Sequence, residues 1–242
     1  IDSRRTAKEK SKHLETVPIE NKESYRWIEG QREARRIAEM CSDTQCVLVC
    51  DSESDIYELL SEPQETSHGH PLQILIRACQ DRATDVPQEK LLETIRSSKV
   101  LSTTSVEVSE RKAKTKVDSS KRGASRIARS ANLAIKACEV TLRPPARPDR
   151  TLPPVTLNAV LAEELDPPAN QPPIQWLLLT TLPIDSLEQV LTIIDYYCCR
   201  WLIENLFKVL KSGCRVEERQ FETLDRELNA IAVYLIAAWR IH

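Results

Sequence analysis

Short continuous apolar runs are the feature that most restricts the fold of this chain. Cys46–Cys50, Leu72–Cys79 and Trp176–Thr181 are each rich in Leu, Ile or Val. Runs of this length and composition are typical of strands that are buried on both faces of a sheet. The segments Glu23–Met40 and Asp55–Ser61 instead predict helices. Strand, helix and strand in this order indicate a layered α/β core.

Residues 101–173 show a different pattern. Ser105–Glu110 alternates in polarity, and Ala134–Leu142 and Thr156–Leu165 predict longer strands on either side of the proline-rich segment Arg143–Pro154. We therefore predict a mostly β insertion with loops. We expect four parts in the chain: a charged mobile arm (1–22), a first part of the core (23–100), the insertion (101–173), and a last part of the core (174–242) that closes with helices at Ser186–Lys211 and Leu224–Arg240.

The composition indicates a reduced, cytosolic protein without a membrane segment. No apolar run approaches the ~20 residues that a membrane-spanning helix needs, and the eight cysteines form no close Cys-x-x-Cys pair. The net charge of −2 conceals a basic run, Arg111–Arg129, with eight Lys or Arg and one acid. Such a run is commonly a solvated loop, but in a DNA-binding protein it would contact the phosphate backbone. The chain begins at Ile1 and its only methionine is Met40, so we expect the start of its reading frame to be missing.

The segment Tyr197–Lys211 carries the clearest chemical signal. At roughly 100° per residue, Tyr197, Arg200, Glu204, Lys208 and Lys211 fall on one helical face. One interpretation is a solvated face with a Glu204–Lys208 ion pair. The other is that Glu204 binds a metal ion while the cations hold phosphates, as phosphodiester chemistry requires.

The spacing of Tyr197, Arg200, Glu204 and Lys211 matches the Tyr-Arg-Glu-Lys ("YREK") signature of the insertion-sequence-four family of DDE transposases. The chain resembles this family at further segments in the same order: Val49–Ile56 is similar to the segment around the family's second catalytic aspartate, and Thr156–Leu165 and Gln175–Thr180 are similar to the flanks of the β insertion in the transposon-five enzyme. The resemblance extends from about residue 22 to the last residues.

This resemblance implies an RNase H-like core, incomplete at its N-terminus and interrupted by a mostly β insertion. Asp51 and Glu204 would be catalytic metal ligands in a site for two Mg²⁺ or Mn²⁺ ions, where water and then a DNA 3′-hydroxyl attacks. The partners would be transposon ends and target DNA, with a homodimer in the synaptic complex. Such a protein would work in the bacterial cytosol, associated with the nucleoid.

The same resemblance implies DNA contacts at six residues: Tyr197, Arg200, Lys208, Lys211, Trp176 and Arg77. Trp176 would stack against a flipped base or in its place. From its sequence context alone, Trp176 could equally be a core residue that begins a strand, and Arg77 could be a surface charge at a strand end. Asp51 could simply cap the helix that follows.

No residue corresponds to the family's first catalytic aspartate, because Asp2 has no strand before it. We therefore expect these 242 residues to be inactive alone. The main alternative is a DNA-binding remnant that occupies transposon ends or inhibits a full-length enzyme. A further alternative is an α/β metal-dependent phosphatase or nuclease that uses Asp51 and Asp55, which leaves the helical face around Glu204 unexplained.

Overall fold

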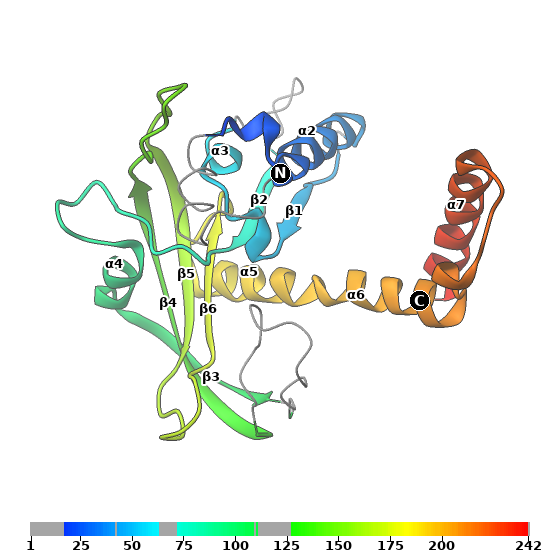
Figure 1. Ribbon diagram of the computed structural model, residues 1–242. Helices are drawn as coiled ribbons and strands as arrows, with labels where there is room; N and C mark the ends of the chain where they lie inside the picture. The colour runs from blue at the N-terminus through cyan, green and yellow to red at the C-terminus, as the bar shows by residue number, and fades with distance from the viewer. Residues whose placement is uncertain (1–16, 42, 63–71, 109, 111–126, 242) are drawn as a thin grey trace, which may run out of the picture. The chain divides into compact units, whose positions relative to one another are not determined.

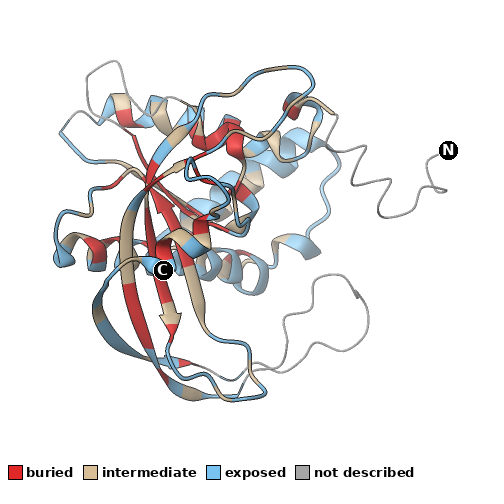
Figure 2. Ribbon diagram, turned by 90° about the vertical axis from the view of Figure 1, so that its left-hand side faces the viewer, coloured by how far each residue is buried: buried red, intermediate tan, exposed pale blue. Residues whose placement is uncertain are grey.

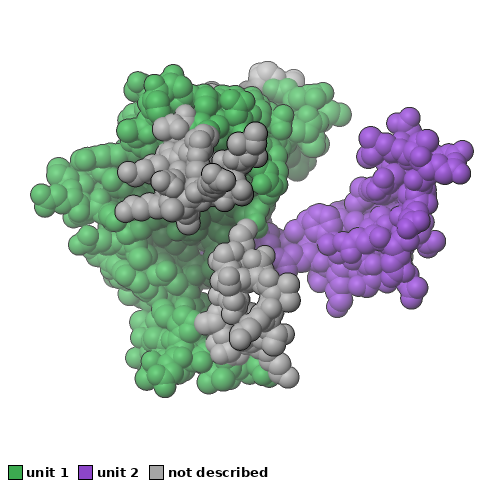
Figure 3. Space-filling model, viewed as in Figure 1, with its two compact units in different colours: residues 1–193 green, residues 194–242 purple. Residues whose placement is uncertain are grey.

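The computed structural model describes residues 17–41, 43–62, 72–108, 110 and 127–241. The chain forms two compact units, residues 1–193 and residues 194–242 (Figure 3). Each unit is described by itself below. No helix within the described ranges combines the length and hydropathy needed to cross a lipid bilayer.

Helices and strands are interspersed in the first part of the chain, four consecutive strands follow, and the chain ends in helices (Figure 1). The helices are η1 (Ile19–Asn21), α2 (Tyr25–Met40), η2 (Ser52–Ser54), α3 (Tyr57–Leu60), α4 (Leu91–Ser97), α5 (Leu187–Cys199), α6 (Trp201–Lys208), the π-helix η3 (Val209–Gly213), η4 (Val216–Glu218) and α7 (Leu224–Ile241). The strands are β1 (Val47–Cys50), β2 (Gln73–Arg77), β3 (Val100–Val108), β4 (Arg129–Leu142), β5 (Val155–Glu164) and β6 (Gln175–Thr180).

These strands form one mixed sheet of six strands in the order β1-β2-β6-β5-β4-β3. β1 and β2 are parallel, and every other neighbouring pair is antiparallel. The three strands expected in the insertion therefore pair, through β6, with the strands of the predicted core. The predicted α/β class is confirmed, and a mixed sheet with helices is compatible with an RNase H-like transposase fold.

Hydrophobic packing on the sheet explains why the short apolar runs are strands. Ile74, Leu75 and Ile76 are all fully buried, although successive residues of a strand point to opposite faces. Both faces of β2 are therefore covered. Figure 2 shows buried segments, in red, along several strands of the sheet. On one face, Ile74 and Ile76 belong to a cluster with Ile28 of α2 and Leu91 of α4. This cluster fixes the helices against the strands that carry the candidate site.

The expected single helix Ser186–Lys211 is wrong in detail. The helix breaks at Arg200 between α5 and α6, and it ends in the π-helix η3, where the Cys214 amide donates to the Val209 carbonyl at 2.9 Å. A π turn is wider than an α turn, so Lys211 does not continue the regular face that runs through α6. The predicted helix Leu224–Arg240 is confirmed as α7.

The basic run also needs a correction at its end. Residues 111–126 lie outside the described residues, but Arg129 begins β4 and is not part of an exposed loop. Its guanidinium forms two hydrogen bonds to the carboxylate of Glu164, at 2.8 and 2.7 Å, and both side chains are buried. Arg129 therefore holds β4 against β5 instead of offering a charge to DNA.

Candidate active site

Asp51 lies at the carboxyl end of β1, where the chain leaves the sheet. Its backbone is extended, and one carboxylate oxygen, Oδ1, accepts a hydrogen bond from the Glu53 amide at 2.9 Å. Asp51 thus caps the short helix η2, as sequence reasoning had considered. The residue is only half-buried, and this cap engages one of its two carboxylate oxygens.

Arg77 lies at the same edge of the sheet as Asp51. In the parallel pairing of β1 with β2, Cys50 is level with Ile76, so the next residue of each strand emerges at the same end. The Arg77 guanidinium is half-buried and donates to the Gln175 carbonyl at 3.4 Å. The sheet therefore places a carboxylate and a cation from two neighbouring strands together.

A cavity of about 350 Å³ lies beside these two residues. Its lining consists of Ser52, Arg77, Ala78, Cys79, Gln80, Asp81, Leu92, Gln175 and Leu177. Ser52 directly follows Asp51, and Gln175 directly precedes Trp176. The cavity is therefore lined by Arg77 itself and by the sequence neighbours of two further predicted site residues. The lining contains one cation, Arg77, and one carboxylate, Asp81, so an anionic group such as a phosphodiester would have to be bound at the Arg77 side of the cavity.

Trp176 lies near the start of β6 and is half-buried. It packs against a small cluster formed by Val108, Ala131, Leu133 and Ala162. The residue therefore has a packing role, and the part that remains accessible is what a stacked base would use.

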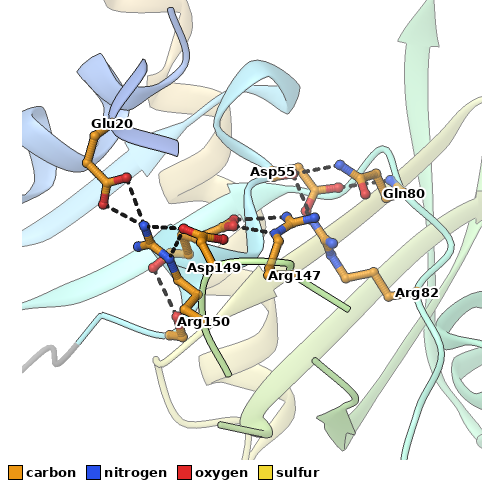
Figure 4. A network of polar contacts seen from close by, with 9 residues as sticks. Glu20, Asp55, Gln80, Arg82, Arg147, Asp149 and Arg150 are labelled. Atoms are coloured by element: carbon orange, nitrogen blue, oxygen red, sulfur yellow. Dashed lines mark hydrogen bonds and ion pairs between the residues drawn. The ribbon is translucent and has the colours of Figure 1, made fainter. Parts of the chain in front are cut away.

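Asp55 lies four residues after Asp51 but is in a different environment. Its side chain is 0% exposed and pairs with Arg82 at 2.6 Å. It also accepts hydrogen bonds from the amides of Cys79 and Gln80. Figure 4 shows Asp55 between Gln80 and Arg82. Because both carboxylate oxygens are already engaged, this geometry disfavours the phosphatase interpretation, in which Asp55 would bind a metal ion.

Burial has raised the pKa of the thiols that flank this edge. Burial, against a smaller effect of the Ser54 hydrogen bond, raises the pKa of Cys50 to about 11. Burial and then the negative charge of Asp55 raise the pKa of Cys79. Both thiols are therefore protonated at neutral pH and are poor nucleophiles or metal ligands.

The second unit carries Glu204 in the first turn of α6. The carboxylate of Glu204 is 45% exposed and accepts a hydrogen bond from the Arg200 guanidinium at 2.8 Å. Arg200 also lies over the rings of Tyr197 and Trp201, with its guanidinium carbon 5.9 and 5.3 Å from the ring centroids. Burial lowers the pKa of Arg200, but the interactions with Glu204 and Tyr197 together outweigh this effect, so the net pKa is raised.

The remaining residues of the predicted face differ in their surroundings. Tyr197 is buried, whereas Lys208 is exposed at the end of α6. Lys211 lies in η3 and pairs with Glu217 at 2.8 Å. Tyr197 is thus better placed to orient Arg200 than to contact a DNA backbone directly, while both lysines lie at the surface of this unit.

Sequence reasoning missed two contacts around Asp51. Arg26 of α2 pairs with Glu53 at 3.0 Å, and Arg82 pairs with Asp55. Each partner is 27 residues away in sequence, so no local periodicity could have identified it. Within each unit, no three described His, Cys, Asp or Glu side chains are grouped closely enough to hold a metal ion.

Comparison with known protein families assigns the chain. Residues 31–240 match the family described as "Transposase DDE domain". The match includes all six strands, Asp51 and Glu204, and it spans well over half of the 242 residues. The family carries out DNA transposition, and its members generally use divalent metal ions. The chain therefore belongs to the DDE-domain transposases.

Proposed function

We propose that this chain is the strand-cutting and strand-joining domain of an insertion-sequence-four transposase. The observation that carries the proposal is the family match combined with the spacing of Tyr197, Arg200, Glu204 and Lys211. Asp51 supports it, because its carboxylate lies at the carboxyl end of β1 and its side chain remains partly accessible.

We propose Asp51 and Glu204 as the residues that hold Mg²⁺ or Mn²⁺. Both carboxylates are partly exposed, and each is a hard oxygen donor. Mg²⁺ is commonly bound by only one or two carboxylates together with substrate phosphates and water, so this donor set fits the ion. When bound, such ions would stabilise the charge that develops on the attacking and leaving oxygens of a phosphodiester.

The DNA would be held by the cations and aromatic residues around these carboxylates. Arg77 emerges beside Asp51 into the polar cavity and would bind a phosphate of the transposon end. Arg200, oriented by Tyr197, and the lysines Lys208 and Lys211 would neutralise further phosphates. Trp176 would stack on a base with its accessible surface. A homodimer acting on paired ends in the bacterial cytosol is the corresponding assembly.

We further propose that these 242 residues do not cleave DNA alone. Only two positions of the catalytic triad are matched, and removing one of three ligands disturbs both ions of a two-metal site. The alternative function is occupation of transposon ends without catalysis.

Both proposals can be tested on DNA that carries the ends of the element that encodes the chain. The 242 residues, and a version extended by the upstream coding sequence, are each incubated with labelled ends and Mn²⁺. We expect cleavage only by the extended version, and its loss in Asp51→Asn and in Glu204→Gln. Cleavage by the 242 residues would overturn the inactivity, and cleavage that survives both substitutions would overturn the site. End binding without cleavage by either version would favour the non-catalytic alternative.

A further inference from the structure

We propose that Asp55 is a positioning residue that fixes the turn bearing Asp51 to the segment that follows β2. The inference rests on the proposed function, because it concerns how the carboxylate of Asp51 is held. It assigns no new metal ligand. The role that it gives to the buried Asp55–Arg82 pair is to keep the turn that bears Asp51 in position.

Asp55 accepts hydrogen bonds from three residues of the segment 79–82. Its Oδ2 accepts hydrogen bonds from the amides of Cys79 and Gln80, both at 2.8 Å. Its Oδ1 accepts from the Arg82 guanidinium at 2.6 Å. The Asp55 carbonyl accepts from the Gln80 side chain at 2.9 Å and from Arg82 at 2.7 Å (Figure 4). Five hydrogen bonds thus converge on a single residue.

These contacts are buried, and their geometry is therefore strongly determined. The side chains of Asp55 and Arg82 are 0% and 9% exposed. A buried carboxylate that moved would leave its own charge and that of Arg82 without a partner, which is a costly arrangement in a protein interior. Asp55 therefore holds residues 79–82 at a fixed distance from the end of η2.

The other end of the turn holds Asp51. The Asp51 carbonyl accepts from the Ser54 hydroxyl at 2.7 Å and from the Ser54 amide at 3.3 Å. The Asp51 carboxylate accepts from the Glu53 amide, and the thiol of Cys79 donates to the Ser52 carbonyl at 3.3 Å. Residues 51–55 are therefore fastened by β1 at one end and by Asp55 at the other.

This second attachment matters because β1 is short. It has four residues, and among the described strands it pairs only with β2. A four-residue edge strand alone leaves the turn after it free to shift. The Asp55 contacts remove that freedom, and they also fix residues 79–81, which line the cavity beside Arg77.

The test compares Asp55→Asn with Glu58→Gln in the same 242-residue chain. Glu58→Gln breaks another buried ion pair, Glu58–Arg147, whose atoms are 2.6 Å apart, without touching the turn. Hydrogen exchange of the Glu53 amide, measured by NMR, reports the turn, and calorimetric titration with Mn²⁺ alone reports the carboxylate. Thermal unfolding of both variants measures the loss of global stability, which both substitutions share.

We expect Asp55→Asn to speed exchange at Glu53 at least about tenfold, while Glu58→Gln leaves it near the wild-type rate. We also expect Mn²⁺ affinity to fall about tenfold in Asp55→Asn alone, as for other residues that orient a metal ligand. Equal effects in the two variants, or no effect of Asp55→Asn, would overturn the proposal. If the wild-type chain binds no Mn²⁺, the metal part of the proposed function fails, and the exchange rates still decide this inference.

A second pair of variants covers the case in which Asp55→Asn does not fold. Arg82→Gln leaves the backbone hydrogen bonds to Asp55 in place, so we expect a smaller change at Glu53 in the same direction. In the double variant Asp55→Asn, Arg82→Gln, the two amides can bond to each other, and exchange should return toward the wild-type rate. If the two substitutions changed the exchange rate at Glu53 additively, the proposed positioning role of the Asp55–Arg82 pair would be contradicted.

Discussion

Arg200 lies one helical turn before Glu204, and its guanidinium donates a hydrogen bond to the glutamate's carboxylate at 2.8 Å. The charge of the proposed metal ligand is thus neutralised by its own neighbour. A cation that binds Glu204 has to compete with Arg200, whereas a phosphate that binds Arg200 releases Glu204. Metal binding and DNA binding are therefore expected to favour each other at this helix.

Substituting Arg200 separates these two effects. In Arg200→Gln we expect Mn²⁺ alone to bind about two- to fivefold more tightly, because a partly exposed ion pair contributes only about 0.2 to 1 kcal/mol. The same variant should bind DNA more weakly. Calorimetric titrations with Mn²⁺ and with a DNA duplex check both changes. Weaker Mn²⁺ binding in Arg200→Gln would show that the arginine does not compete for Glu204.

Arg77 is expected to contact a phosphate from the edge of the sheet beside Asp51. Arg77→Gln should weaken DNA binding and reduce the slope of log K against log salt by about 0.9 for duplex DNA. The matched control is Arg36→Gln, which removes an exposed arginine that pairs with Glu33 on α2. Fluorescence anisotropy over a range of salt concentrations measures both slopes. An unchanged slope in Arg77→Gln would remove Arg77 from the interface.

Trp176 combines a packing role with the proposed stacking role. Trp176→Leu keeps an apolar side chain in the cluster but removes the large aromatic face, so we expect a loss of about 1 to 3 kcal/mol in DNA binding. Trp27→Leu is the control, because Trp27 is also partly buried but packs against the main core. If both variants unfold at similar temperatures and bind DNA equally well, the stacking role is wrong.

The Glu58–Arg147 pair predicts how stability depends on pH. Burial raises the pKa of Glu58, but the Arg147 hydrogen bond and nearby positive charge outweigh it, so the net pKa lies below the ordinary 4.5. The folded chain therefore binds fewer protons than the unfolded chain near this pH, and the pair stabilises the fold fully above 4.5. This contribution is lost as the pH falls through the lowered pKa.

Glu58→Gln tests this sign. At neutral pH we expect it to lower the free energy of unfolding by roughly 3 kcal/mol, since Arg147 keeps a charge without its partner. At a pH about one unit or more below the ordinary value, the difference from the wild-type chain should shrink. Urea unfolding at both pH values measures it. A difference that grows in acid would mean that the pair does not lower the pKa.

The positions of β2 and β6 could be predicted from sequence because each is a short, continuous apolar run that is largely buried. The break at Arg200 could not, because Tyr197–Lys211 keeps a helical spacing of apolar and polar residues throughout. The π turn at η3 is likewise invisible to a fixed 100° period. Helix α4, which has seven residues, was not predicted.

The positions of some of the proposed site residues in the fold could also be predicted from sequence. Asp51 and Glu204 stand in local motifs, and Arg77 ends a recognisable strand. The buried pair of Asp55 with Arg82 and the pair of Arg129 with Glu164 join residues 27 and 35 positions apart. Only the folded sheet brings such residues together, so the single sequence contains no local sign of them.

Titration with Mn²⁺ tests the central claim most directly. The wild-type chain, Asp51→Asn, Glu204→Gln and the double variant are each titrated by calorimetry. We predict that the wild-type chain binds the ion, that each single substitution weakens binding, and that the double variant loses little more than either single variant, as the proposed shared site requires. Binding that is unchanged in both single variants, or absent from the wild-type chain, would contradict the assignment of Asp51 and Glu204 as the metal ligands.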